Sequence, residues 1–376
     1  MTNAPTGNAP AARKVDGFWA LLRSWSVPLF FLILCVAGAA AARLDVNYLI
    51  REVIGRLGRN AFLVLSLIIP VMAGLGLNFG IVVGAMAGQT ALVIITHYGF
   101  RGIGGFGLAA LISMPFALLF GYLTGLVLNR AKGREMVTGM ILGFFANGLY
   151  QLVYLVLVGT VIPMNNPDMM LRSGVGLKNT VDLFWIGNSL DRALDPIWNG
   201  MIMGEVAGIP IGPWRLPVGT LLVVVLLCVF TAFITRTKLG QEMRAVGQDR
   251  HIAQVSGINV DRTRIIAIMF STVLAAWGQL IFLQNMGTFN TYSSHEQVGT
   301  LSVAAILVGG ATTRRATIWN AIVGVLLFHT LFVVSPDAGQ RLFGNAQVGE
   351  YFRSFLSYGV IAVALAMHAW QSRAAK

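Results

Sequence analysis

The feature that most constrains this chain is a series of apolar runs, each close to the length that crosses a lipid bilayer. A membrane-spanning helix needs about 20 predominantly apolar residues. Ten runs approach that length: 27–42, 61–77, 79–98, 106–128, 136–160, 216–234, 265–285, 298–313, 316–334 and 351–370. They are continuous, whereas the strands of a membrane barrel alternate apolar and polar residues. The sequence therefore predicts an all-α polytopic membrane protein with about ten transmembrane helices.

Composition excludes the other broad classes of protein. Only 11% of the 376 residues are charged, and the mean hydropathy is +0.72. A soluble domain carries roughly 25% charged residues, so the chain lacks the polar surface that a soluble or a disordered protein needs. The two cysteines, Cys35 and Cys228, lie inside apolar runs, and no zinc, calcium or redox motif occurs, so we expect no disulfide and no metal site.

Charge distribution orients the predicted helices. With the amino terminus inside, 16 of the 27 Lys and Arg residues fall on the cytoplasmic side. This agrees with the positive-inside rule, and it explains the net charge of +12 without invoking nucleic acid. Both termini are then cytoplasmic. The predicted organisation is a cytoplasmic tail (1–26) and a single transmembrane domain (27–376), with a long outer loop at 163–213 and a cytoplasmic loop at 235–264.

One basic segment departs from that rule. Residues 43–59 carry four arginines on the predicted outer side, and their apolar residues have helical periodicity. We expect a short amphipathic helix on the outer membrane surface. Two interpretations stay open: the arginines reach lipid headgroups, or Arg51, Arg56 and Arg59 receive an acidic partner protein.

Small and polar residues inside the spans suggest close packing and a pathway. Glycines recur every four residues from Gly76 to Gly88, a pattern that lets helix backbones approach closely. Polar side chains are costly in lipid, so they face a partner or a cavity. Asn78 and Gln89 are predicted to share one helix face. The candidate pathway residues are Asn78, Phe79, Gln89, Asn147, Gln151, Tyr154 and Gln279.

These amides and aromatic residues suit a neutral, hydroxyl-rich solute, although an interhelical hydrogen bond explains each amide alone equally well. No carboxylate lies within the predicted spans from 61 to 313. Proton-coupled transport usually needs such a group. A stand-alone secondary transporter is therefore disfavoured, and an intramembrane enzyme lacks a catalytic constellation.

The predicted cytoplasmic loop contains residues that commonly begin and end short helices. In residues 237–264 (TKLGQEMRAVGQDRHIAQVSGINVDRTR), Asp249 is a suitable N-cap. Gly257 is suited to a left-handed helix end, and Asp261 is expected to cap the next span. A plain linker between two membrane helices would not need these residues.

This loop resembles the coupling loop of permease subunits in ATP-binding-cassette (ABC) importers, in the group for ribose, simple sugars, nucleosides and branched-chain amino acids. The similarity extends through residues 307–311 (LVGGA). The matching loop residues are Thr237, Gly240, Arg244, Ala245, Gly247, Ser256, Gly257, Ile258, Asn259 and Val260. By this resemblance, the residues expected to contact the ATPase are Gly240, Glu242, Arg244, Gly247, Asp249, Ser256, Gly257 and Ile258.

The resemblance implies a permease of the bacterial inner membrane, surrounded by lipid, with four further components. These are a second permease subunit, identical or not, two ATPase domains, and an extracytoplasmic solute-binding protein that docks on Arg51, Arg56 and Arg59. No phosphate-binding loop of the Gly-x-x-x-x-Gly-Lys type occurs in the sequence. We therefore expect no catalytic residue and no cofactor in this chain, with ATP and Mg²⁺ on the partner ATPase.

One sequence motif differs from that of ribose-type permeases, and this difference bears on the class of solute. Those permeases carry a GGIDLSVG-like motif where this chain has Gly76–Gly84, GLNFGIVVG, without the Asp and Ser. We therefore expect a simple sugar or a nucleoside-like solute. The alternative is a branched-chain amino acid or another small metabolite.

The orientation is testable with single cysteines at Arg130, Gln248 and Asn188, in a variant that lacks Cys35 and Cys228. Only the cysteine at 188 should react with a membrane-impermeant thiol reagent in intact cells, because the other two positions lie inside. Reaction at position 248 would contradict the ten-span topology.

Overall fold

The computed structural model describes residues 11–164, 166–183, 194 and 217–373. Most of these residues are helical. The elements are α1 (Ala11–Ala42), α2 (Val46–Ser66), α3 (Ile68–Met72), α4 (Ile81–His97), α5 (Gly102–Arg130), α6 (Glu135–Leu152), η1 (Val153–Leu157), β1 (Thr180–Asp182), α8 (Val218–Ile234), α9 (Lys238–Gln248), α10 (Arg250–Val255), α11 (Val260–Met286), β2 (Thr288–Asn290), α12 (Glu296–Val308), α13 (Ile318–Phe343) and α14 (Ala346–Arg373).

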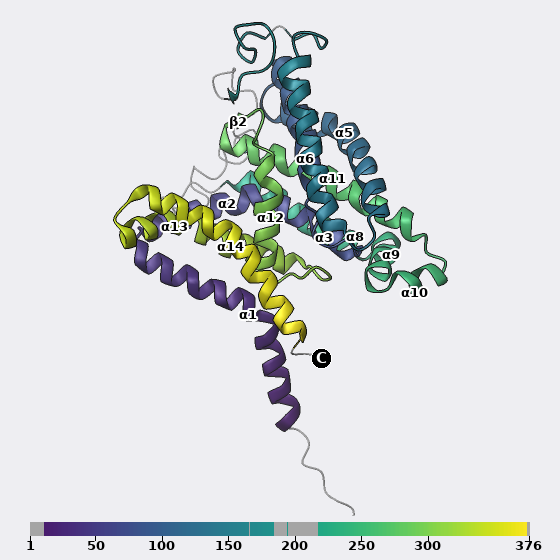
Figure 1. Cartoon of the computed structure of the whole chain (residues 1–376), viewed down its shortest axis with the longest axis vertical. Helices are drawn as coiled ribbons and strands as arrows, with labels where there is room; N and C mark the ends of the chain where they lie inside the picture. The colour runs from purple at the N-terminus through teal and green to yellow at the C-terminus, as the bar shows by residue number, and fades with distance from the viewer. Residues whose placement is uncertain (1–10, 165, 184–193, 195–216, 374–376) are drawn as a thin grey trace, which may run out of the picture.

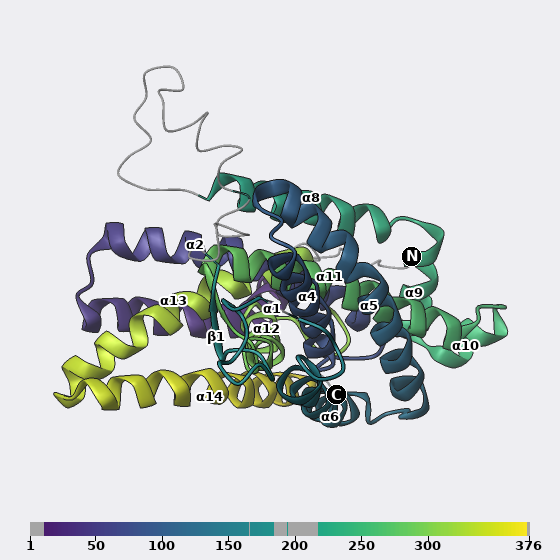
Figure 2. The same cartoon turned by 90° about the horizontal axis from the view of Figure 1, so that it is seen from above.

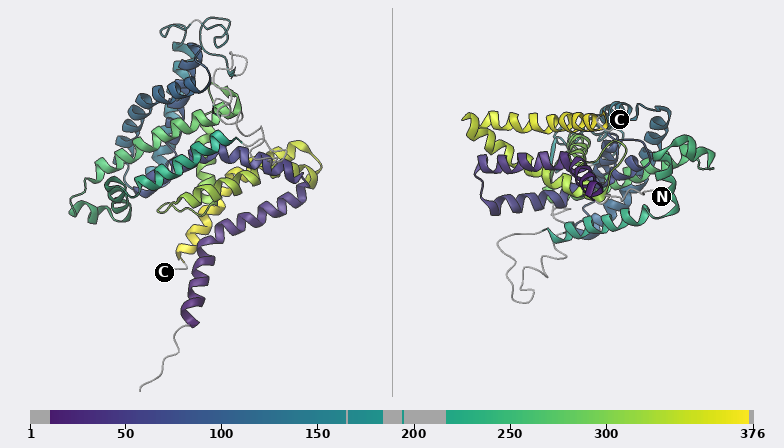
Figure 3. Two further views of the ribbon diagram at one scale, coloured as in Figure 1. Left: turned by 180° about the vertical axis from the view of Figure 1, so that it is seen from behind. Right: turned by 90° about the horizontal axis from the view of Figure 1, so that it is seen from below.

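Helix α11 is the central element. It packs against α5, α4 and α2, and most of its middle residues are buried. A second group of helices forms around α13, which contacts α1, α2, α12 and α14 (Figures 1 and 2). The short helices α9 and α10 lie at one end of α11, and β2 lies at the other end (Figures 1 and 3). The two ends of α11 therefore mark two opposite sides of the molecule.

Length and hydropathy support the predicted fold class. Among the described residues, six helices are long and apolar enough to cross a membrane, and a seventh crossing results if the bent pair α8–α9 is one span. Helices α4 and α12 are apolar but shorter. The prediction of an all-α polytopic membrane protein is confirmed, whereas the count of ten and the cytoplasmic position of both termini stay predictions.

The amino-terminal predictions need two corrections. Residues 11–26, predicted as a flexible tail, belong to helix α1, which continues to Ala42. Residues 43–59 do not form a separate surface helix, because α2 runs without interruption from Val46 to Ser66 and buries its second half. The predicted helical periodicity is confirmed, but Arg51, Arg56 and Arg59 lie within a long apolar helix and not in a separate surface helix.

A buried break separates α3 from α4. Residues 73–80 are not helical, and Gly74 and Gly76 adopt positive φ angles of 71° and 73° that favour glycine. The Asn78 Oδ1 atom accepts a hydrogen bond from the Gly80 amide at 2.9 Å, and Asn78 is only 4% exposed. Asn78 therefore precedes α4, so the prediction that it shares a helix face with Gln89 is wrong.

The glycine repeat serves the contact between α4 and α11. A Cβ atom on Gly88 would lie 2.3 Å from the Ala276 carbonyl oxygen, and one on Gly84 would lie 2.6 Å from that of Thr272. These distances are shorter than any normal contact, so only glycine permits this approach of the two backbones. The close-packing interpretation of the repeat therefore holds for these two members.

We expect Gly88→Val to destabilise the protein, because the branched side chain must push α4 away from α11. Overpacking of this kind costs about 1–3 kcal/mol. The measurement is the thermal unfolding midpoint in detergent. Gly107→Ala on α5 is the control, because a Cβ atom there meets nothing within 4 Å. Equal midpoints for the two variants would contradict the packing role of Gly88.

Candidate functional site

Three helices, α4, α6 and α12, bring a partly buried polar cluster together near the β2 end of α11. The His295 ring joins two of the predicted pathway residues: its Nε2 lies 2.8 Å from Asn147 Oδ1, and its Nδ1 lies 3.2 Å from Gln89 Oε1. Asn147 also donates a 2.6 Å hydrogen bond to the Glu296 carboxylate. Gln151 Nε2 lies 3.4 Å from Asn147 Oδ1. We call these five residues the polar cluster.

Backbone carbonyls of a small sheet hold the cluster in place. β1 and β2 pair antiparallel, with Thr180 opposite Asn290. The Gln89 amide donates to the carbonyls of Asn290 and Thr291 at 3.0 and 2.8 Å. Since Gln89 and His295 are fully buried, their hydrogen bonds fix the side chains as a rigid support for Asn147.

A cavity of about 410 Å³ opens beside the polar cluster. Asn147 and Glu296 contribute polar atoms to its wall, and Phe79 contributes an aromatic ring. The other lining residues are Val82, Met140, Gly143, Phe144, Gln297, Gly299, Thr300 and Tyr358. The cavity thus has the size and the mixed lining typical of a small-molecule site.

The remaining predicted pathway residues lie elsewhere. Tyr154 stacks on Tyr150 with ring centroids 4.5 Å apart, and both line a separate apolar cavity of about 480 Å³ between α4, α5 and α6. Gln279 is buried in α11, with Nε2 3.5 Å from the Ser294 carbonyl. Asn78 is buried in the break before α4, and its Nδ2 atom has no hydrogen-bond partner among the described residues. Asn78 and Gln279 therefore do not line the cavity.

Sequence reasoning missed His295 and Glu296. The two residues precede the apolar run at 298, so they were assigned to a loop. The predicted spans contain no carboxylate, but Glu296 lies two positions before the predicted span 298–313, and its carboxylate lies in the cavity wall and pairs with Asn147. The signal that could have found them is an adjacent His-Glu pair directly before an apolar run.

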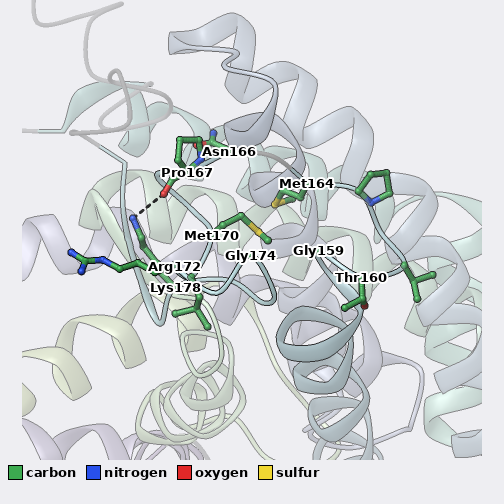
Figure 4. A pocket seen from close by; sticks show the side chains of 12 residues that line it. Gly159, Thr160, Met164, Asn166, Pro167, Met170, Arg172, Gly174 and Lys178 are labelled. Atoms are coloured by element: carbon green, nitrogen blue, oxygen red, sulfur yellow. Dashed lines mark hydrogen bonds between the residues drawn. The ribbon is translucent and has the colours of Figure 1, made fainter.

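The loop predicted to lie outside is placed, in its described part, at this end of the molecule, because β1 pairs with β2. Its described part, residues 163–164, 166–183 and 194, contains β1 and surrounds a hollow of about 780 Å³. Lys178 reaches across to the Pro167 carbonyl at 3.1 Å, and Arg172, which is exposed, also lines the hollow (Figure 4). The rest of the predicted loop 163–213 is outside the described residues.

The three arginines predicted for docking are not equivalent. Arg51 is exposed. Arg56 Nε donates to Glu52 Oε1 at 2.9 Å, and Arg59 Nη2 lies 3.5 Å from the same oxygen. The side chains of Arg56 and Arg59 are only 19% and 16% exposed, so most of their charge is turned toward the protein.

At the other end of α11, the loop predicted to be cytoplasmic forms two short helices, α9 and α10. α9 is capped by Thr237, and the Asp249 carboxylate caps α10 by accepting from the His251 and Ile252 amides at 2.8 and 3.0 Å. The amides of Gly257 and Ile258 donate to the carbonyls of Gln254 and Ala253, which is the Schellman pattern, and the φ angle of Gly257 is 84°.

One cap differs from the prediction. α11 begins at Val260, and its N-cap is Asn259, whose Oδ1 accepts from the Arg262 amide at 3.0 Å. Asp261 lies in the first turn instead, where a negative charge favours the helix dipole. The helix begins two residues earlier than expected because Asn259, directly after Ile258, is itself a good cap.

Two of the predicted coupling residues are tightly packed glycines, and most of the others are exposed. A Cβ atom on Gly240 would lie 2.2 Å from the Ile234 carbonyl oxygen, and one on Gly247 would lie 2.1 Å from that of Met72. These glycines allow the 74° bend between α8 and α9 and the contact of α9 with the end of α3. Arg244, Asp249, Ser256 and Gly257 are exposed, whereas Glu242 and Ile258 are partly buried.

The fold and these two regions define a polytopic membrane protein with a buried polar cluster at one end and a capped helical loop at the other. Residues 49–365, most of the chain, match the family described as the permease component of branched-chain amino acid transport systems. The chain belongs to this family. With its apolar helices, it is a multi-pass protein of the bacterial inner membrane.

Curated relatives are similar over part of their length. A probable ABC transporter permease of Escherichia coli, YphD, is 31% identical over 40% of this chain and 43% of its own. The nucleoside ABC permease NupB of Lactococcus lactis is 22% identical over 60% and 54%. The xylose permease XylH of Haemophilus influenzae is 26% identical over 38% and 37%. The alignments thus span about half or less of these relatives, and no solved structure matches.

We expect Gly257→Val to disturb α10 more than Asp249→Ala. Valine at a positive φ angle costs about 1–3 kcal/mol of backbone strain, although its Cβ atom would clash with none of the described residues. Losing the N-cap costs about 1 kcal/mol. Amide hydrogen exchange in residues 250–258 measures both effects. Asp249→Asn is the control, because asparagine caps as well as aspartate, and faster exchange in this control would contradict the capping role.

Proposed function

We propose that this chain is the membrane-spanning permease subunit of an ABC importer that moves a small neutral solute, a simple sugar or a nucleoside-like molecule. The observation that carries this proposal is the 410 Å³ cavity, whose polar wall is formed by Asn147 and Glu296. Membership in a permease family supports it, as do relatives named for nucleoside and xylose transport.

The position of the cavity favours a pathway shared with a second subunit. Helix α6 presents apolar residues on the same face, among them Ile141 and Phe144, which are 62% and 72% exposed. Lipid would suit these apolar side chains, but it would not suit the Glu296 carboxylate and the Asn147 amide in the neighbouring cavity wall. We infer that this face meets a second permease subunit, identical or different, and that the polar wall lines a water-filled passage between them.

The cytoplasmic loop supplies a surface for an ATPase. Ile252 and Val255 on α10 are 64% and 77% exposed, and exposed apolar side chains on a rigid helix suit a protein partner. We infer that α9 and α10 dock on one of two ATPase domains, with Arg244 and Ser256 as polar contacts. In this proposal the ATPase domains bind and hydrolyse ATP with Mg²⁺, and this chain forms the passage for the solute.

The chemistry of the cavity favours a hydroxyl-rich solute over an amino acid. A carboxylate and an amide together accept and donate hydrogen bonds, as sugar and ribose hydroxyls require. The negative charge of Glu296 would repel the carboxylate of an amino acid. Phe79 offers an apolar face on which a sugar ring or a base packs.

On the outer side, the exposed cations suit an acidic solute-binding protein. Arg51 keeps its proposed docking role because it is exposed, and Arg172 on the outer loop joins it (Figure 4). Arg56 and Arg59 contribute less because Glu52 partly neutralises both. In this proposal the loop 163–213 lies outside, whereas the loop 235–264 and both termini lie inside. The whole of 27–376 acts as one permease domain.

The test is uptake by complexes reconstituted with the ATPase and the solute-binding protein, using labelled pentoses, hexoses, nucleosides and branched-chain amino acids. Asn147→Leu should lower uptake roughly tenfold or more, because it removes the amide from the cavity wall and leaves the buried His295 Nε2 atom without this partner, at about 1–3 kcal/mol for a buried polar group. Leu152→Ala is the control, since that side chain is exposed on the same helix, outside the cavity.

Two outcomes would contradict this proposal. Normal uptake by Asn147→Leu would reduce the polar cluster to a packing element. ATP-dependent uptake of amino acids alone would overturn the solute class but leave the permease role intact.

A further inference from the structure

Three charged residues meet where the cytoplasmic loop joins the membrane helices. Arg250 begins α10, Glu135 begins α6, and Arg264 lies in the second turn of α11. The Glu135 Oε1 atom accepts from Arg250 Nη2 at 2.8 Å and from Arg264 Nη2 at 2.6 Å. We call these three residues the charged cluster.

Burial makes this cluster rigid. Arg264 is 1% exposed and Glu135 is 9% exposed, so removing either partner would leave a charge stranded away from water. Arg264 also donates from Nη1 to Asn129 Oδ1, at 2.8 Å, near the end of α5. A single carboxylate oxygen thus ties the amino-terminal ends of α6, α10 and α11 together, and Arg264 adds α5.

Arg250 has a second contact that reaches the buried break before α4. Its Nη2 atom donates to the Gly74 carbonyl at 2.9 Å. Next to it, a Cβ atom on Gly74 would lie 2.9 Å from the Gly247 Cα atom, so α9 and the break are in direct backbone contact. Residue 79, five positions beyond Gly74, lines the cavity.

The charged cluster therefore touches two elements that also form walls of the cavity. Glu135 begins α6, which contributes Met140 and Asn147 to the lining, and Gly74 begins the segment that contributes Phe79. The elements contacted by α9 and α10 are the same elements that shape the cavity.

We propose that Glu135 is a positioning residue that transmits movement of the α9–α10 loop, through Arg250, to α6 and to residues 73–80, and so changes the shape of the cavity. This inference rests on the proposed function, because it takes an ATPase as the source of the movement. Arg264 holds the Glu135 carboxylate in place, while Arg250, 38% exposed, is the member that moves with the loop.

The test uses Met140→Cys as a reporter, in a variant without Cys35 and Cys228, purified as the complex with its ATPase subunits. Met140 lines the cavity and is 42% exposed. The measurement is the rate of labelling by a hydrophilic maleimide, before and after trapping with ATP and vanadate. We expect trapping to change the rate severalfold in the reporter and to leave it unchanged when Arg250→Gln is added.

Companion variants separate transmission from stability. Arg250→Lys keeps the charge and one hydrogen bond, so it should restore part of the change. Lys132→Gln, an exposed cation in the α5–α6 connection, is the matched control and should keep the full change. Thermal midpoints verify that each complex is folded.

The outcomes distinguish this inference from the proposed function. A reporter complex that contains no ATPase would overturn the proposed function itself. A reporter complex that binds ATPase and keeps its full response with Arg250→Gln would overturn the role of the charged cluster alone. If Arg250→Gln fails to assemble, Glu135→Asp, which keeps the charge but shortens its reach, gives the same two outcomes.

Discussion

The contact between α4 and α11 is the constraint on which the rest of the structure depends. Lipid gives helices little hydrophobic reason to associate, so membrane helices are held by close packing and by hydrogen bonds between them. Gly84 and Gly88 let the α4 backbone meet the backbone of α11 at Thr272 and Ala276. Because α11 is the central helix, this contact fixes where α4 carries Gln89 and where the break before α4 lies.

Two polar groups of residues lie at opposite ends of that packed core. Near β2, the polar cluster places His295 between Gln89 and Asn147 and sets the wall of the cavity. Near α10, the charged cluster binds Arg250 and Arg264 to one carboxylate oxygen of Glu135. Buried polar groups must find partners, so each group locks several helices to one another. Helix α6 belongs to both, and it connects the two ends physically.

Much of the fold and part of the site followed from short-range patterns. The continuous apolar runs predicted membrane helices, and the caps at Asp249 and Gly257 were correctly placed because they depend on neighbouring residues only. The boundary between the predicted spans 61–77 and 79–98 falls inside the break at 73–80, but Asn78 was wrongly placed on a helix. The arginines of 43–59 were found to be helical, yet their partner Glu52 was not considered.

The sequence by itself determined that this chain is a membrane protein, where the capped helices of residues 237–258 lie and which family the chain resembles. These properties depend on hydropathy, capping and local motifs, all of which act over a few residues or one span. Only the tertiary structure decided that Glu296 joins Asn147, 149 positions away in sequence, or that Arg264 pairs with Glu135, 129 positions away. Such pairs form because folding in lipid forces distant polar groups together, and no local pattern records which partner each one meets.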